Sequence, residues 1–186
     1  ISTKVFEKRV IGIGPKKDQE FNVECPTSYL VNLEFHNRAL IQITLSFDVA
    51  AHQRNHIELY GDKGSMIVPD PNMFGGSVLT CTDDYGAWEE HKTDELPLGK
   101  INITSQSERA NESPTNANYR GVGLSEMAYC IENGLKHRCS GELSLHVLDI
   151  IKSTMKAADT QTPQQIKTTC KKADFFTLEE IQKILK

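Results

Sequence analysis

Three side chains with metal-binding chemistry lie close together in the sequence: His52, His56 and Glu58. On an extended strand, positions 52, 56 and 58 share one face, so their spacing is compatible with a metal site. No further ligand cluster with a recognisable spacing accompanies them, and Cys81 or Cys139 could be added only arbitrarily. The sequence therefore favours solvent-facing histidines on a sheet, and we expect no bound metal.

Other basic side chains, in the later half of the chain, have the chemistry to contact a polar ligand. They are Arg120, His137, Arg138 and His146. His146 falls inside a predicted helix, where a buried or half-buried histidine hydrogen-bonded to the backbone or to a carboxylate is the favoured interpretation. Arg138 falls at a turn between helices, where it could pair with a carboxylate such as Glu142 or reach a ligand hydroxyl.

The sequence shows no arrangement of residues typical of acid–base or nucleophilic catalysis. The paired acids at 83–84, 89–90 and 179–180 are neighbours in sequence, so they point in different directions and suit a solvated surface. There is no GxSxG segment, and we assign no catalytic residue. Asp70 lies between Pro69 and Pro71, which restrict the backbone, and we expect it to form an Asx turn.

Glycine pairs occur twice, as Gly12-Ile-Gly14 and Gly121-Val-Gly123. The first is followed by proline and charged residues instead of a helix, and the second follows a polar stretch instead of a buried strand. Neither has the third glycine of a dinucleotide-binding turn. We therefore expect no cofactor to be bound by these residues.

Composition is that of a soluble globular chain, with 38% hydrophobic and 25% charged residues and a formal net charge of −4. Basic residues are scattered, so nucleic acid and membranes are not expected partners. Five widely spaced cysteines without a CxxC motif favour a reducing compartment. No apolar run approaches the roughly 20 residues of a membrane helix, and residues 1–8 do not form a signal peptide, so we expect a cytoplasmic protein.

Hydrophobic periodicity predicts strands first and helices afterwards. Apolar residues alternate over 27–36 and again over 41–48, which predicts a β-hairpin. We expect Asn37 to take the left-handed conformation of its turn, followed by Arg38 where glycine is usual, a slightly strained choice. Further strands are expected at 4–14, 56–60, 65–69, 76–82 and 88–92, and a long polar loop at 94–118. Helices are expected at 122–132, at 141–159 after a Ser140 cap, and after a capping box at Thr177–Glu180.

This order predicts one α+β domain spanning residues 1–186, with a large, mostly antiparallel, open β-sheet and helices packed on one face. The apolar face of the hairpin packs on helices, and the other face is left for water, substrate or a second copy. An uncovered sheet face or edge favours pairing, so we expect a homo-oligomer, most simply a dimer, through the sheet.

Two blocks of the sequence are similar to one known family. They are Asn55–Ser77, with its Ile-Glu-Leu-Tyr-Gly-Asp-Lys-Gly and Pro-Asp-Pro-Asn-Met-Phe-Gly-Gly segments, and Arg120–Asp149. Both resemble the C-terminal half of Gfo/Idh/MocA oxidoreductases. That resemblance implies the fold of a dihydrodipicolinate reductase-like C-terminal domain, and it places Arg120, His137, Arg138 and His146 at or behind a substrate cleft.

The resemblance also implies an activity for a longer parent protein. Family members oxidise or reduce a sugar or polyol at a CH–OH group with NAD or NADP, which an N-terminal Rossmann domain binds. No EKP motif of the family is found here, and family order places the helix that carries its DxxxH motif just upstream of a strand like 4–14. Since the chain opens at Ile1, we expect a fragment that lacks the Rossmann domain, shapes the substrate site and the oligomer, and is inactive alone. The alternative is a stand-alone sheet-based binding or dimerisation module without catalysis.

Overall fold

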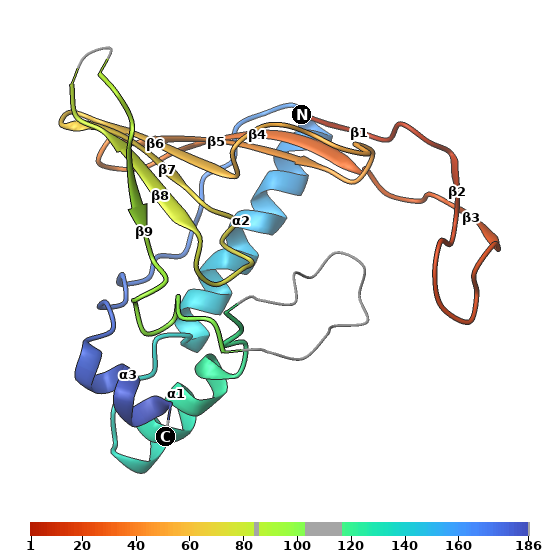
Figure 1. Ribbon diagram of the computed structural model, residues 1–186. Coiled ribbons are helices and arrows are strands. Elements are labelled where there is room, and N and C mark those ends of the chain that lie inside the picture. The colour runs from red at the N-terminus through yellow and green to blue at the C-terminus, as the bar shows by residue number, and fades with distance from the viewer. Residues whose placement is uncertain (84–85, 103–116, 186) are drawn as a thin grey trace. The chain divides into compact units, whose positions relative to one another are not determined.

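The computed structural model describes residues 1–83, 86–102 and 117–185 (Figure 1). Within these residues it contains nine strands and three helices, and every strand pair is antiparallel. The α+β class is therefore confirmed. Contacts gather the chain into two compact units: unit 1 (Ile1–His52 and Ser140–Lys172) and unit 2 (Gln53–Cys139 and Ala173–Lys186). The organisation of residues 1–186 as one domain stays a prediction.

Unit 1 contains a three-stranded sheet in the order β1 (Ser2–Thr3), β4 (Ser28–Glu34), β5 (Leu40–Ser46). The β4–β5 hairpin pairs Tyr29 with Leu45 and Glu34 with Leu40. Side chains along β4 alternate between half-buried and exposed, because successive residues of a strand point to opposite faces. The half-buried face is the apolar one that the sequence pattern predicts.

The turn of this hairpin differs from the prediction in one detail. Arg38, not Asn37, has a positive φ, of 71°. Asn37 instead accepts a hydrogen bond from the backbone N–H of Ala39 through Oδ1, at 3.1 Å. The short side chain of Asn37 thus closes the turn, and the left-handed residue is the one after it.

A second, two-stranded sheet in unit 1 pairs β2 (Lys8–Val10) with β3 (Glu20–Asn22). The prediction of one strand over 4–14 is wrong, because the chain leaves the extended conformation after Val10 and turns back toward β3. The turn includes positive φ values at Gly14 and Asp18. Short strands with few apolar residues give too weak a pattern to place their ends from sequence.

Helix α2 (Gly141–Thr160) belongs to unit 1 and contacts β1. Ser140 begins it as predicted, since its Oγ accepts the backbone N–H of Leu143 at 3.2 Å. Gln161 ends it with a positive φ of 53°. The predicted cap and start are confirmed.

Unit 2 contains a four-stranded sheet in sequence order: β6 (Ile57–Gly61), β7 (Gly64–Val68), β8 (Ser77–Cys81) and β9 (Glu89–Lys92). Gly64 closes the β6–β7 turn with a φ of 140°, and a Cβ there would overlap the carbonyl oxygen of Cys81. Glycine alone adopts this positive φ without strain and has no Cβ to overlap the Cys81 carbonyl.

Two helices complete unit 2: α1 (Val122–Glu132) and α3 (Leu178–Ile184). The capping box predicted for α3 is present, because Thr177 accepts from the backbone of Glu180 and Glu180 accepts from the backbone of Thr177. Ile181 and Ile184 are the buried residues of α3. The two helices contact each other.

The strands of the described residues are divided among three sheets, of four, three and two strands. We had expected one large sheet, so that part of the prediction is wrong.

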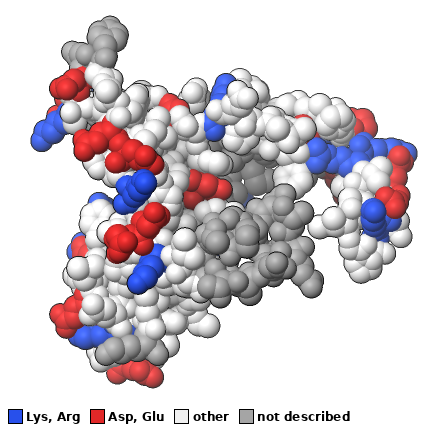
Figure 2. All heavy atoms as spheres, viewed as in Figure 1, with Lys and Arg blue, Asp and Glu red and all other residues white. Residues whose placement is uncertain are grey.

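Residues 103–116 of the predicted loop 94–118 lie outside the described residues. Figure 2 shows basic and acidic side chains mixed over the viewed face, the β2–β3 hairpin included. Among the described residues, no helix combines the length and the apolar character that spanning a membrane demands.

Candidate functional site

One polar site of unit 2 is built on the loop between β7 and β8. Asp70 lies between two prolines, and its Oδ1 accepts the backbone N–H of Asn72 at 2.9 Å. The backbone N–H of Met73 donates to the Asp70 carbonyl at 3.0 Å. This is the predicted Asx turn, and it fixes the loop at the end of β7.

Arg120, just before α1, binds this loop from a distant part of the sequence. Its Nη2 donates to the carbonyl of Asn72 at 3.1 Å, and its Nη1 lies 3.4 Å from Asn72 Oδ1. The side chain of Asn118 orients the arginine by accepting the Arg120 backbone N–H at 3.2 Å. Two segments 48 residues apart therefore meet at one arginine.

Aromatic contacts support the same junction. The rings of Phe74 and Tyr119 meet edge to face, with centroids 5.7 Å apart. Phe74 also forms an isolated antiparallel bridge with Ala117, which is 7% exposed. The Tyr119 hydroxyl donates to the carbonyl of Lys100 at 2.9 Å. The loop is thus held by an aromatic contact as well as by hydrogen bonds.

We call His56, Asp70, Asn72 and Arg120 the Asn72–Arg120 cluster. His56 Nε2 lies 3.8 Å from Asp70 Oδ2, which makes an ion pair when the imidazole is protonated. His56, Asn72 and Arg120 are exposed, and Asp70 is half-buried. The cluster presents a guanidinium, an amide, a carboxylate and an imidazole together, which are donors and acceptors suited to hydroxyl groups.

His52, His56 and Glu58 do not come together as ligands. Glu58 accepts hydrogen bonds from Tyr60 Oη and from Asn55 Nδ2, and these two donors lower the pKa of its carboxyl. His56 faces Asp70 instead. Within the described part of the chain, no group of three potential ligands has the geometry to hold a metal ion.

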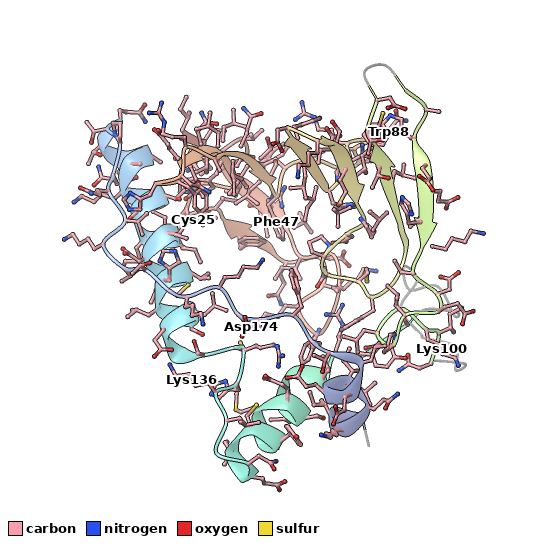
Figure 3. The ribbon with its side chains drawn as sticks, turned by 90° about the vertical axis from the view of Figure 1, so that its left-hand side faces the viewer. Cys25, Phe47, Trp88, Lys100, Lys136 and Asp174 are labelled. Atoms are coloured by element: carbon pink, nitrogen blue, oxygen red, sulfur yellow. The ribbon has the colours of Figure 1, made fainter. Side chains whose placement is uncertain are left out.

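Arg138 is engaged in a network inside unit 2. Its Nη1 donates to Glu126 at 3.1 Å, and its Nη2 donates to both carboxylate oxygens of Glu180, at 3.0 and 3.1 Å. Its Nε donates to the carbonyl of Asp174, labelled in Figure 3, at 2.9 Å. These partners make Arg138 a residue that joins segments of the fold, and a ligand would compete with two carboxylates for it.

His137, next to it, is half-buried, and its Nδ1 is buried without a hydrogen-bond partner among the described residues. Unpaired buried polar atoms are rare and mark places where a water, an ion or a ligand contributes. His137 therefore remains a candidate ligand-binding residue, whereas Arg138 stabilises the fold.

His146 lies in unit 1, on α2. Its Nδ1 is 3.0 Å from Thr168 Oγ1, and that hydroxyl donates to Asp149 Oδ2 at 2.9 Å. Asp149 also accepts the backbone N–H groups of Lys167 and Thr168, and these bonds, those of Thr168 first, lower the pKa of its carboxyl. The histidine is half-buried, within the predicted range, but its partner is the Thr168 hydroxyl and not a backbone group or a carboxylate.

Sequence reasoning missed Glu126 and Asp149. Asp149 is three residues after His146, a spacing that places both on one side of a helix, so a signal was present. Glu126 is 2% exposed in the middle of α1, and nothing in its spacing distinguishes it from a surface glutamate. Its role depends on Arg138, twelve residues later.

Comparison with known proteins identified no relative: no family model, no curated protein and no solved structure matches the chain.

Proposed function

We propose that this chain is the substrate-shaping and oligomerising part of an NAD(P)-dependent sugar or polyol oxidoreductase of the Gfo/Idh/MocA type. One observation carries the proposal. The two blocks on which the sequence resemblance rests, 55–77 and 120–149, are joined by the contact of Arg120 with Asn72. Blocks that resemble one family at separate places in the sequence also cooperate in space, which supports a common origin for them.

The chemistry of the Asn72–Arg120 cluster agrees with a polyol ligand. Sugar hydroxyls both donate and accept hydrogen bonds, and the cluster offers both kinds of partner on a loop that the Asx turn holds in place. The unpartnered Nδ1 of His137 supplies a further polar group in unit 2. Arg138 and His146 belong to the proposal as supporting residues, since each is held by its own hydrogen-bond network.

The finer fold is part of this proposal. We infer that the antiparallel strands belong to a dihydrodipicolinate reductase-like C-terminal domain. NAD or NADP would be bound by a Rossmann domain elsewhere in a longer protein. Hydride transfer requires that bound nicotinamide and a positioned base, and we assign neither to these residues, so this chain alone is expected to be inactive.

A titration with polyols tests the binding proposal. Backbone amide NMR shifts should move at Asn72, Arg120 and their neighbours when a sugar alcohol is added to millimolar concentration. Arg120→Met should abolish these shifts, and Arg54→Met, a change at an exposed arginine outside the cluster, should leave them intact. Equal responses of both variants, or shifts elsewhere only, would contradict the proposal.

A cofactor-binding experiment tests whether NAD(P) is bound by a separate Rossmann domain and not by this chain. Calorimetry of the 186-residue chain with NAD(H) and NADP(H) should show no micromolar binding. The encoding reading frame should hold roughly 120–150 further residues with a GxGxxG or GxGxxA turn, the usual size and mark of a Rossmann domain. Tight binding of a nicotinamide cofactor to the chain alone would overturn the assignment.

A second candidate is a sheet-based dimerisation module without catalysis. It is favoured by Leu30 and Leu40, which are 58% and 77% exposed on the open face of the β4–β5 hairpin. This reading predicts self-association but no response to polyols, so the NMR titration separates the two.

A further inference from the structure

Residues 173–185, which we call the C-terminal strap, belong to the second stretch of unit 2. The strap carries α3, which lies beside α1 (Figure 1). Of its apolar side chains only Ile181 and Ile184 are buried, each 7% exposed, whereas Phe175 and Leu178 are 81% and 65% exposed. A helix of seven residues is not stable by itself, so other contacts must hold the strap in place.

Arg138 provides those contacts. Beyond its bonds to Glu180 and the Asp174 carbonyl, its Nη2 lies 3.2 Å from the carbonyl of Phe175. Its guanidinium also stacks over the ring of Phe176, 4.0 Å from the centroid. One side chain thus contacts four residues of the strap, three of them consecutive. Figure 3 labels Asp174 and Lys136 on the two segments that Arg138 joins.

The same arginine has a separate partner on α1. Glu126 is 2% exposed and accepts both the side chain and the backbone N–H of Arg138, at 3.1 and 2.9 Å. If the strap lifts, Arg138 can stay with Glu126, so no buried charge is left without a partner. The strap can therefore detach without leaving the buried Glu126 carboxylate unpaired, which would cost several kcal/mol.

Cys130 is 4% exposed and contacts Glu126, the α1 partner of Arg138. Its Sγ is 3.6 Å from Glu126 Oε1 and 3.7 Å from the carbonyl of Lys136. Burial, and then the charge of Glu126, raise the pKa of the thiol, and the charge of Glu180 adds to this effect. Burial and the neighbouring carboxylates thus favour the protonated thiol, which is the unreactive form.

We propose that the C-terminal strap is a latch: it opens locally at the Arg138–Glu180 ion pair, while α1 stays folded, and opening uncovers Cys130. The latch does not depend on the proposed oxidoreductase function, because it is defined by contacts within unit 2.

Alkylation of cysteines tests the latch. The chain is exposed to excess iodoacetamide, and labelling of each cysteine is followed by mass spectrometry, with the exposed Cys139 as an internal reference. Glu180→Gln removes the charge but keeps a side chain that completes a capping box. It should accelerate labelling of Cys130 roughly tenfold, the change expected for loss of a charge-assisted hydrogen bond.

The matched control is Glu179→Gln, one residue earlier on α3. Glu179 pairs with Lys183 at 2.6 Å and has a 78% exposed side chain. This change should alter Cys130 labelling by less than about twofold, as for surface ion pairs. Equal acceleration by both variants would overturn the proposal.

Urea distinguishes local opening from global unfolding. At low concentrations, labelling of Cys130 in the unchanged chain should depend on urea much less steeply than global unfolding does, because local opening exposes little surface. Arg138→Lys, which keeps the charge but loses the bidentate fork, should give an intermediate labelling rate. If Cys130 reacts only with the urea dependence of global unfolding, there is no latch.

Discussion

At the scale of single residues, the hydrogen bonds around His146 determine where its proton sits. Thr168 has one hydroxyl hydrogen and donates it to Asp149, whose ionised carboxylate can only accept. His146 must therefore donate from Nδ1 to Thr168 Oγ1, which leaves the lone pair on Nε2.

Nitrogen NMR of the imidazole checks this assignment. At a pH where His146 is neutral, long-range proton–nitrogen spectra should show the Nδ1–H tautomer. Thr168→Val should shift the imidazole toward the Nε2–H form, whereas Thr168→Ser, which keeps the hydroxyl, should not. An Nε2–H form in the unchanged chain would contradict the network.

Glu180 makes a pH prediction with a definite sign. Its pKa falls from 4.5 to about 2, first because it accepts the Thr177 backbone N–H and then because of Arg138. Since the folded value is the lower one, its ionised form stabilises the fold above pH 4.5, and this stabilisation is lost as the pH falls from 4.5 toward 2.

The difference in urea midpoint between the unchanged chain and Glu180→Gln measures this contribution. It should be largest at neutral pH and shrink as the pH falls through that window. A difference that stays constant down to pH 2 would mean that the carboxylate charge plays no part in stabilising the strap.

Residue roles were predictable where the partner is near in sequence. The Asx turn of Asp70 and the capping box of Thr177 join residues two or three apart, so the residue types alone indicate them. The partners of Arg138 are 12 and 42 residues away, and only the fold brings them together. The Arg120–Asn72 contact, 48 residues apart, was beyond sequence reasoning for the same reason.

At the scale of elements, the β6–β7 turn depends on Gly64. Gly64→Ala would force a Cβ onto the Cys81 carbonyl in a backbone conformation that alanine disfavours, so it should destabilise unit 2 by more than about 1 kcal/mol. Gly61→Ala, at the other end of the same turn, meets only an ordinary contact of 3.6 Å and should cost less. Thermal unfolding of the two variants measures the contrast, and equal losses would contradict it.

Elements with a strong period were predicted well. The β4–β5 hairpin and the three helices lie within a few residues of the expected ranges, because alternation and helical spacing extend over long segments. β3 was missed, because a three-residue strand of Glu20, Phe21 and Asn22 has no usable period.

At the scale of the whole molecule, the proposed oligomer can be tested on the open face of β4. Leu30 is exposed on that face, and Leu30→Glu should convert a dimer to a monomer in sedimentation equilibrium, since a charge would be buried there. Leu96→Glu, at a leucine of similar exposure (55%) outside the sheets, should leave the dimer intact. A strict monomer of the unchanged chain at high concentration would refute self-association.

Sheet organisation could not be predicted, because strand pairing between distant segments leaves no mark in local periodicity. Alternation shows that a strand has two faces but not which strand lies beside it. The number of sheets and the division of the chain into units depend on such pairings.

Each unit is assembled from two separate stretches, and this affects how the protein is made in the cell. A ribosome completes residues 53–139 before it adds the insertion of 140–172, and only then the strap that covers α1. Unit 2 therefore emerges with Ile181, Ile184 and Glu180 still missing, and the nascent chain must tolerate an uncovered α1 throughout that interval of translation.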